Sequence, residues 1–215
     1  MDAYDGLLNL IRSGSFDVDT KVSELSLAET LGMSRTPVRE ALRVLDAQGL
    51  VESRGRGVRV RVPKQRELAE AFDTRCALEA HAAQAAAKAQ RDGLLLPARL
   101  REVRLLADRC DETTRAEGPA AGAAANRAFH LAVSALAGNA QLQGFLEVIW
   151  DQITIATRAG LTLPPRIHDV HAEHEALLAA ITAGDPAGAR AAAERHIGRT
   201  HNLTQSHDQD PEEQL

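Results

Sequence analysis

The sequence of 215 residues predicts a mainly α-helical fold in two parts, and three observations lead to this prediction. Aromatic residues make up only 3% of a chain rich in Ala, Leu and Arg, a composition that favours helices over sheets. Apolar residues recur at helical spacing over most of the chain. Strict alternation is confined to residues 58–62. We therefore expect three helices and a β-hairpin at the N-terminal end, followed by an all-α bundle of about six helices.

The N-terminal part begins with three short helical patterns. Residues 3–12 and 23–31 form the first two, and Gly32 closes the second. The third helix begins after Ser34, because serine is a favoured N-cap residue. It ends near Gly49, where glycine supplies a left-handed C-cap.

The third helix has one apolar face and one basic face. The apolar positions follow the i, i+3, i+4, i+7 pattern and are Val38, Ala41, Leu42 and Leu45. Arg35, Arg39 and Arg43 are spaced by four residues and form a stripe along another side. Residues 35–66 hold nine Lys/Arg against three acids, whereas the whole chain has a net charge of −5. A concentrated basic patch indicates a polyanionic partner, although charge alone fits a solvated surface equally well.

A β-hairpin follows this helix directly. Residues 50–53 and 58–62 are the expected strands, and the segment RGRG at 54–57 joins them. Helix, helix, short turn, helix and basic hairpin is the order of a winged helix-turn-helix, which binds DNA. We expect this domain to span residues 1–62.

The remainder of the chain is helical. Residues 63–66 are the expected linker, and residues 67–204 form a bundle without a visible repeat. The expected helices lie near 67–91, 97–116, 120–137, 140–159, 165–183 and 186–203. The polar and acidic tail, residues 205–215, is expected to be disordered.

Several classes of protein are disfavoured. No apolar run reaches the roughly 18 residues of a membrane span, and the N-terminus lacks a basic start and cleavage site, so we expect a soluble cytoplasmic protein without a membrane partner. Cys76 and Cys110 are too far apart for a CxxC motif, so neither a disulfide framework nor a zinc ribbon is indicated.

Three of the eight histidines fall on inward faces of the expected bundle. His174 and His196 lie about equally far from the break at 184–186, so an antiparallel pair of helices brings them level. His130 also points inward, with Asn126 one turn before it. Three imidazoles and one amide from several helices fit a metal site better than separate core roles. Zinc is the first expectation, with Ni²⁺ or another divalent ion as the alternative.

Arg75 is expected on the apolar face of its helix. A buried guanidinium needs a carboxylate partner. That partner is either Glu79, one turn along the same helix, or an anionic ligand.

Several motifs resemble a known family. SRTPVREAL at 34–42, followed by a Leu-x-x-x-Gly-Leu-Val run, resembles the GntR family of bacterial transcription regulators. NRAFH at 126–130, AGN at 137–139, EHEALLAAIxAGD at 173–185 and RH at 195–196 resemble the helical ligand-binding FCD domain of its FadR-type subfamily. Together these resemblances cover nearly the whole chain.

The resemblance implies how DNA is read. In such regulators, which are homodimers, the third helix enters the major groove and the wing approaches the minor groove. By position, Arg35 is then the base-reading residue, and Ser34, Thr36 and Arg39 contact phosphates. The wing residues Arg56 and Gly57 contact a groove. Arg43 lies a turn further along and either reaches DNA or pairs with Glu40 or Asp46.

The resemblance also implies a ligand site in the helical domain. There a metal is commonly held by an aspartate at the position of Asn126 and by histidines at those of His130, His174 and His196. Asn126 departs from this pattern and is a weaker, neutral oxygen ligand. An arginine near the position of Arg75 holds the carboxylate of an organic-acid effector.

We therefore expect a ligand-responsive transcription regulator, with a repressor as the first expectation. In it, a small carboxylate changes the affinity of a homodimer for a near-palindromic operator in double-stranded DNA. The chain is not expected to be an enzyme. The alternatives are a metalloenzyme with an appended DNA-binding head, and a regulator whose metal is a structural staple or the sensed signal itself.

Overall fold

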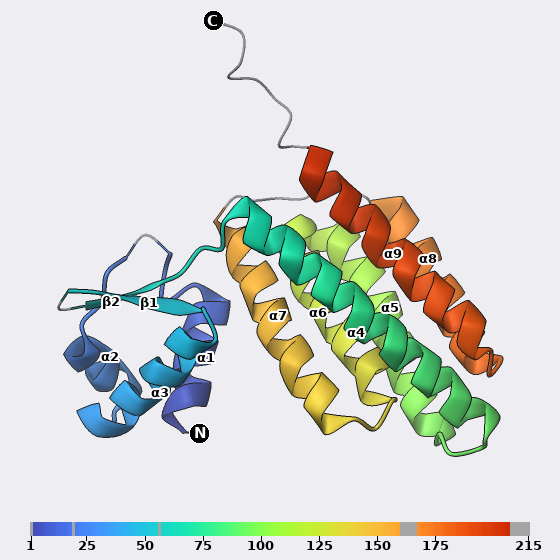
Figure 1. The fold of residues 1–215 in the computed structure, drawn as a ribbon, viewed down its shortest axis with the longest axis horizontal. Coiled ribbons are helices and arrows are strands. Elements are labelled where there is room, and N and C mark those ends of the chain that lie inside the picture. Colours follow the sequence, from blue (N-terminus) through green and yellow to red (C-terminus); the bar gives the residue numbers. More distant parts are fainter. Residues whose placement is uncertain (1, 19, 56, 160–166, 207–215) are drawn as a thin grey trace, which may run out of the picture. The chain divides into compact units, whose positions relative to one another are not determined.

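The structure is a computed structural model that describes residues 2–18, 20–55, 57–159 and 167–206 (Figure 1). The chain divides into two compact units. We call the first the N-terminal unit; it contains the chain up to Leu68 and the residues of one later helix from Asp151 onward. The helical unit contains Ala69–Trp150 and the described residues from 167.

The N-terminal unit has the expected order of elements. Helices α1 (Ala3–Ser13), α2 (Glu24–Leu31) and α3 (Arg35–Ala47) precede strands β1 (Val51–Arg54) and β2 (Gly57–Val60). The strands pair antiparallel, with Val51 opposite Val60 (Figure 1). The side chains of Asp2 and Ser23 cap α1 and α2. The winged helix-turn-helix arrangement is confirmed.

The core of this unit is formed by the apolar faces that the sequence pattern indicates. Val38 and Leu45 of α3 are completely buried together with Leu7 of α1. Ile155, from the end of α7 (Ala140–Arg158), joins the same core. This unit therefore includes a short segment from much later in the chain, which the predicted boundaries of 1–62 do not contain.

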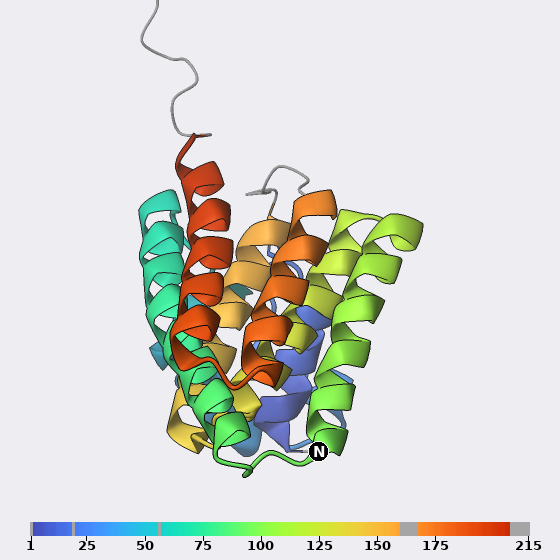
Figure 2. The ribbon, with the colours of Figure 1, turned by 90° about the vertical axis from the view of Figure 1, so that its right-hand side faces the viewer.

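The helical unit is built from long helices packed side by side (Figures 1 and 2). They are α4 (Gln65–Arg91), α5 (Pro97–Glu117), α6 (Pro119–Ala135), the first part of α7, α8 (Ile167–Thr182) and α9 (Pro186–Ser206). Helix α5 packs on α6 and on α8, and α8 packs on α9. Gly184, with a positive φ of 64°, makes the tight turn between the last two helices.

The structure changes the predicted bounds of the linker and of the tail. Helix α4 starts at Gln65, inside the predicted linker 63–66, and α9 extends to Ser206, so the first two residues of the predicted tail are helical. The predicted break at Pro164–Pro165 and the tail from 207 to 215 lie outside the described residues. Helix ends fray easily, so shifts of one or two residues carry no functional weight.

About half of the buried residues in the hydrophobic core of the helical unit are alanines, and they pack with larger side chains such as Phe129 and Ile181. Its buried polar residues are the unusual feature, because buried polar groups must be compensated by partners. They include Arg75, Glu79, His130, His174 and His196. Among the described helices, none is long and apolar enough to cross a membrane.

Candidate functional sites

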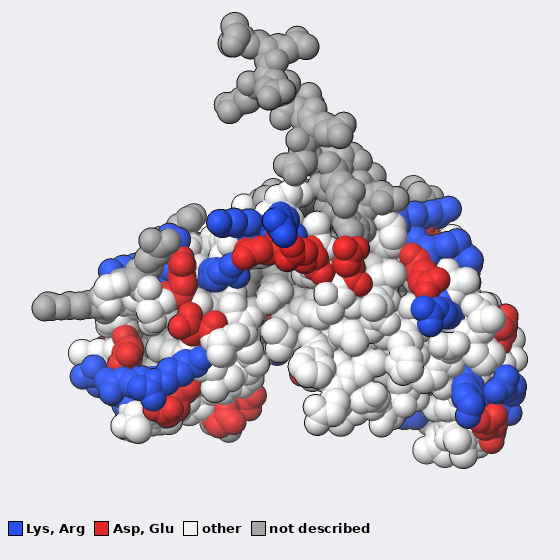
Figure 3. All heavy atoms as spheres, viewed as in Figure 1, with Lys and Arg blue, Asp and Glu red and all other residues white. Residues whose placement is uncertain are grey.

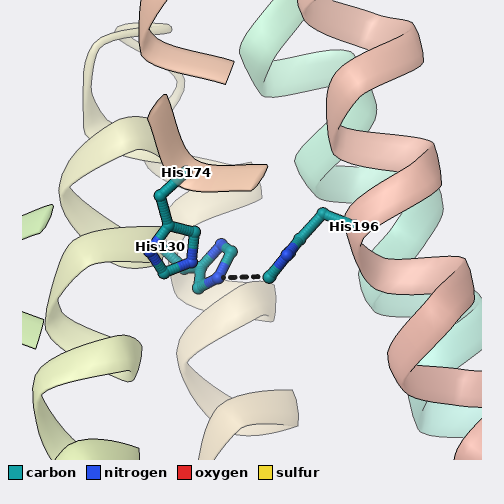
Figure 4. Close-up of side chains that lie close together, drawn as sticks. All are labelled: His130, His174 and His196. Carbon is teal, nitrogen blue, oxygen red and sulfur yellow. Dashed lines mark hydrogen bonds between the residues drawn. The ribbon is translucent and has the colours of Figure 1, made fainter. Parts of the chain in front are cut away.

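Three predicted histidines meet inside the helical unit (Figure 4). His130 comes from α6, His174 from α8 and His196 from α9. The Nε2 atoms of His130 and His196 are 3.0 Å apart, and one ring nitrogen from each of the three lies within 4.8 Å of the others. Each side chain is at most 3% exposed. Two nitrogens bound to one tetrahedral zinc ion lie about 3.3 Å apart, so the cluster is close to a metal-binding geometry.

The turn at Gly184 explains why His174 and His196 meet. Helices α8 and α9 fold back against each other, and both histidines lie about equally far from the turn. His174 shares its buried face with Leu177 and Leu178. The two histidines therefore lie level with each other, as expected from the position of the turn.

Two glutamates lie behind these imidazoles. The Oε2 atom of Glu79 on α4 is 2.7 Å from Nδ1 of His130. The Oε2 atom of Glu173 on α8 is 2.7 Å from Nδ1 of His196, and its Oε1 accepts a hydrogen bond from Arg199. In both histidines the nitrogen that faces the cluster is thus Nε2.

Burial determines the protonation state of the cluster. It lowers the pKa of His130 to about 4, against the opposing effect of Glu79. It also lowers the pKa of His174 well below its ordinary value, and the neighbouring imidazoles add to this effect. The pKa of His196 is lowered by burial, although Glu173 opposes the shift. All three imidazoles are therefore neutral at pH 7, which is the form that binds metals.

The residues present fit a metal ion. The Nε2 atom of His174 is buried and has no hydrogen-bond partner among the described residues. Leaving a buried polar atom unpaired is costly, and a cation at the centre of the cluster would compensate it. Three neutral imidazoles suit a divalent ion such as zinc.

Arg75 lies beside this cluster and is almost completely buried. Its Nε donates a hydrogen bond to Glu79 at 2.7 Å, and its guanidinium carbon lies 3.9 Å from the centre of the Trp150 ring. Trp150 also donates to Glu79. Burial by itself would raise the pKa of Glu79, but Arg75 and His130 hold this pKa well below its ordinary value. The Glu79 partner named from the sequence is present, while Nη2 of Arg75 has no hydrogen-bond partner among the described residues.

Asn126 contacts a cysteine. Its Oδ1 lies 3.9 Å from Sγ of Cys110, whose pKa burial raises to about 11, so that the thiol stays protonated. The role of Asn126 as a fourth metal ligand stays a prediction.

The predicted DNA-contacting face of α3 is exposed, but its arginines have partners. Both Arg35 and Arg39 pair with Glu24 of α2, at 3.6 and 3.0 Å. Arg43 forms the ion pair with Glu40 that was named as the alternative to a DNA contact. Figure 3 shows basic and acidic side chains intermixed on the surface of the N-terminal unit.

The remaining predicted DNA contacts differ in accessibility. Ser34 is the N-cap of α3 but forms no side-chain capping bond, and Thr36 is exposed. Gly57 is buried, and a Cβ there would meet Lys21 and the carbonyl oxygen of Val22, so this glycine allows close packing. Arg56 lies outside the described residues.

Sequence reasoning did not assign a role at the cluster to Glu173, Glu79 or Trp150, nor identify Glu24 as the partner of the recognition-helix arginines. Glu173 precedes His174 and falls off its helical face, so helical periodicity excludes it. Its partner His196 lies on another helix, 23 residues away. Only the packing of α8 on α9 reveals the contact.

Comparison with known families assigns both units. Residues 1–62 match the family described as "Bacterial regulatory proteins, gntR family". Residues 70–199 match the FCD domain.

Individual proteins agree with these matches. The chain is 33% identical over 195 residues to a probable D-xylose utilization operon transcriptional repressor of Paenarthrobacter nicotinovorans, covering 90% of this chain and 83% of the relative. It is 28% identical over 204 residues to the HTH-type transcriptional repressor GlaR of Escherichia coli K12, covering 92% and 91%. The solved structure of McbR/YncC of E. coli superposes with a TM-score of 0.78 at 24% identity, covering 96% of each chain, which shows the same fold.

Proposed function

The chain belongs to the gntR family of bacterial regulatory proteins with an FCD domain, and from this we propose that it is a repressor controlled by a small organic acid. The broader class, a transcriptional regulator of this type, follows from the family and from relatives named as repressors. The same comparisons confirm the prediction that the chain is not an enzyme.

The observation that carries the proposal is the group of three neutral imidazoles and one buried guanidinium inside the helical unit. A core needs no such group for stability, because apolar side chains of similar volume do as well or better. A ligand with a carboxylate is the natural partner of the free Nη2 of Arg75.

His130, His174 and His196 would hold a divalent ion, zinc first and Ni²⁺ as the alternative, with Asn126 as the proposed fourth ligand. When bound, such an ion supplies a positive centre for an anionic oxygen of the effector. Glu79 keeps Arg75 in place, and Arg75 offers its remaining nitrogen. A small carboxylate can bind both the metal ion and the remaining nitrogen of Arg75.

For the DNA-reading role we propose that Arg35 contacts bases and that Ser34, Thr36 and Arg39 contact phosphates. Support comes from their exposure outside the buried face of α3, and from the hydroxyl of Ser34, which makes no capping bond. The wing residue Arg56 is a proposed groove contact, and Arg43 is a further candidate. Gly57 is buried, so we propose that it shapes the wing and does not itself contact a groove. A homodimer of this chain would read a near-palindromic operator in the cytoplasm.

Control by the effector requires two conformations with different operator affinities. The effector can shift their populations only as far as its own affinities for the two differ. A coupling free energy of about 1–3 kcal/mol is typical of such regulation and changes operator affinity roughly 5–150-fold.

A second candidate role for the metal is structural. The three histidines come from three helices, so an ion would tie α6, α8 and α9 together. Thermal unfolding after chelation separates the roles, because a staple is needed for folding whereas a cofactor is needed only for effector binding.

The function is tested with a mobility-shift assay on DNA upstream of the gene for this chain, titrated with small carboxylates. D-xylose is included because the name of one relative mentions it. We expect a specific complex that one of the carboxylates weakens, and we expect chelator to abolish that response. A specific complex that no carboxylate affects would contradict the proposed control, and the absence of any specific complex would contradict the proposed operator.

A further inference from the structure

Glu173 and Glu79 each present a carboxylate to the histidine cluster. In each case Oε2 lies 2.7 Å from the Nδ1 atom of a clustered histidine, His196 for Glu173 and His130 for Glu79. The contact of Glu173 is a hydrogen bond, whereas Nδ1 of His130 has no hydrogen-bond partner among the described residues. Glu173 is therefore the carboxylate that can fix the orientation of a clustered imidazole.

A carboxylate hydrogen-bonded to Nδ1 determines which ring nitrogen carries the proton. An ionised carboxylate can only accept, so the proton of the neutral His196 imidazole belongs on Nδ1. The Nε2 atom of His196 then carries a lone pair. It accepts a hydrogen bond from Nε2 of His130 at 3.0 Å in the metal-free protein, and the same lone pair is available to a cation (Figure 4).

We propose that Glu173 is a positioning residue that holds His196 with Nε2 directed at a metal ion. The inference rests on the metal site of the proposed function. A carboxylate behind a metal-binding histidine fixes the ring orientation and raises the basicity of the metal-facing nitrogen. Loss of such a partner typically lowers metal affinity about 10–100-fold.

Glu173 is the better residue to change. Glu79 is deeply buried and also accepts from Arg75 and Trp150, so its removal threatens the fold. Glu173 is 11% exposed and lines a hollow of about 240 Å³ between α8 and α9, with Ala172, Ala176, Ala192, Arg195 and Arg199. Water can therefore replace its side chain.

The test compares metal affinity, measured by competition with a chromophoric zinc chelator, in wild type, Glu173→Ala and Glu173→Gln. We expect about 10–100-fold weaker zinc binding for Glu173→Ala and a smaller loss for Glu173→Gln, because the amide oxygen still accepts from Nδ1. Glu175→Ala is the matched control, since Glu175 is two residues away and pairs with Arg104. Arg199→Ala controls for the loss of the Glu173–Arg199 pair. Both controls should bind zinc as the wild type does.

A second measurement distinguishes positioning from a structural effect. Imidazole ¹⁵N chemical shifts of the metal-free protein report the tautomer, and we expect His196 to carry the proton on Nδ1. In Glu173→Ala, His196 should lose this preference, with an unchanged thermal midpoint of the metal-free protein.

The outcomes are distinguishable. If wild type binds no zinc, the metal part of the proposed function is wrong. If wild type binds zinc and Glu173→Ala binds it equally well, the positioning role is wrong. Equal losses in Glu173→Ala and Arg199→Ala would likewise overturn it, because the ion pair at the surface would then be the cause.

Discussion

Replacing Arg75 with methionine tests how the helical unit tolerates its buried charges. Methionine keeps most of the apolar stem, so the change removes mainly the guanidinium. Arg75 is 2% exposed and its partner Glu79 is 5% exposed, so the carboxylate cannot turn to bulk water. Removing one partner of a buried ion pair costs about 3–5 kcal/mol, because the other charge stays buried without compensation.

Urea unfolding followed by tryptophan fluorescence is the suitable assay. Trp150 is the only tryptophan of the chain, and its ring lies against Arg75, so its emission reports on this unit. With a slope of about 2 kcal/mol per M, the midpoint should fall by about 1.5–2.5 M. Chelator is present throughout, so that bound metal does not contribute to stability.

The double variant Arg75→Met/Glu79→Gln is the control. It contains no uncompensated carboxylate, so it should be more stable than the sum of the two single changes implies. Additive effects, or a midpoint shift below about 0.5 M for Arg75→Met, would refute the conclusion that Arg75 neutralises Glu79 in a dry environment.

Four further predictions concern DNA, metal and pH. Arg35→Ala should lose about 1–3 kcal/mol of operator discrimination in mobility shifts while remaining folded, and retained sequence preference would remove Arg35 from the base-reading role. Glu24→Gln removes the ion pairs of Arg35 and Arg39 with Glu24, so it should tighten binding to non-specific DNA by up to about 1 kcal/mol at low salt. Weaker binding would show that Glu24 instead holds the two arginines in the orientation that binds DNA. Asn126→Asp should tighten zinc binding in the chelator competition, and an unchanged affinity would place residue 126 outside the ligand set. The metal-free protein should lose stability as the pH falls from about 6.5 toward 4. In this range the unfolded chain binds more protons than the folded protein, because burial lowers the pKa of His130 to about 4 and also lowers those of His174 and His196. A thermal midpoint that does not change over this pH range would contradict burial of neutral imidazoles.

Local patterns in the sequence determined the elements of this fold. Ser23 and Ser34 lie at the starts of α2 and α3, and Gly184 lies at the turn before α9, because capping and left-handed turns depend on one or two residues. The inward faces of His130, His174 and His196 followed from helical periodicity in the same way. The motifs that mark the family are likewise contiguous stretches of chain.

The tertiary structure alone decided what these side chains contact. The pairing of Glu24 with two arginines, of Glu173 with His196 and of Trp150 with Glu79 joins residues on different helices. Ile155 of α7 lies in the core of the N-terminal unit, which no sequence boundary indicated. Such contacts depend on the rotation and depth at which one helix packs on another, and these are set by many side chains at once. The sequence therefore specified the three histidines of the site, and packing specified their carboxylate neighbours and the nitrogen with which His130 and His196 face each other.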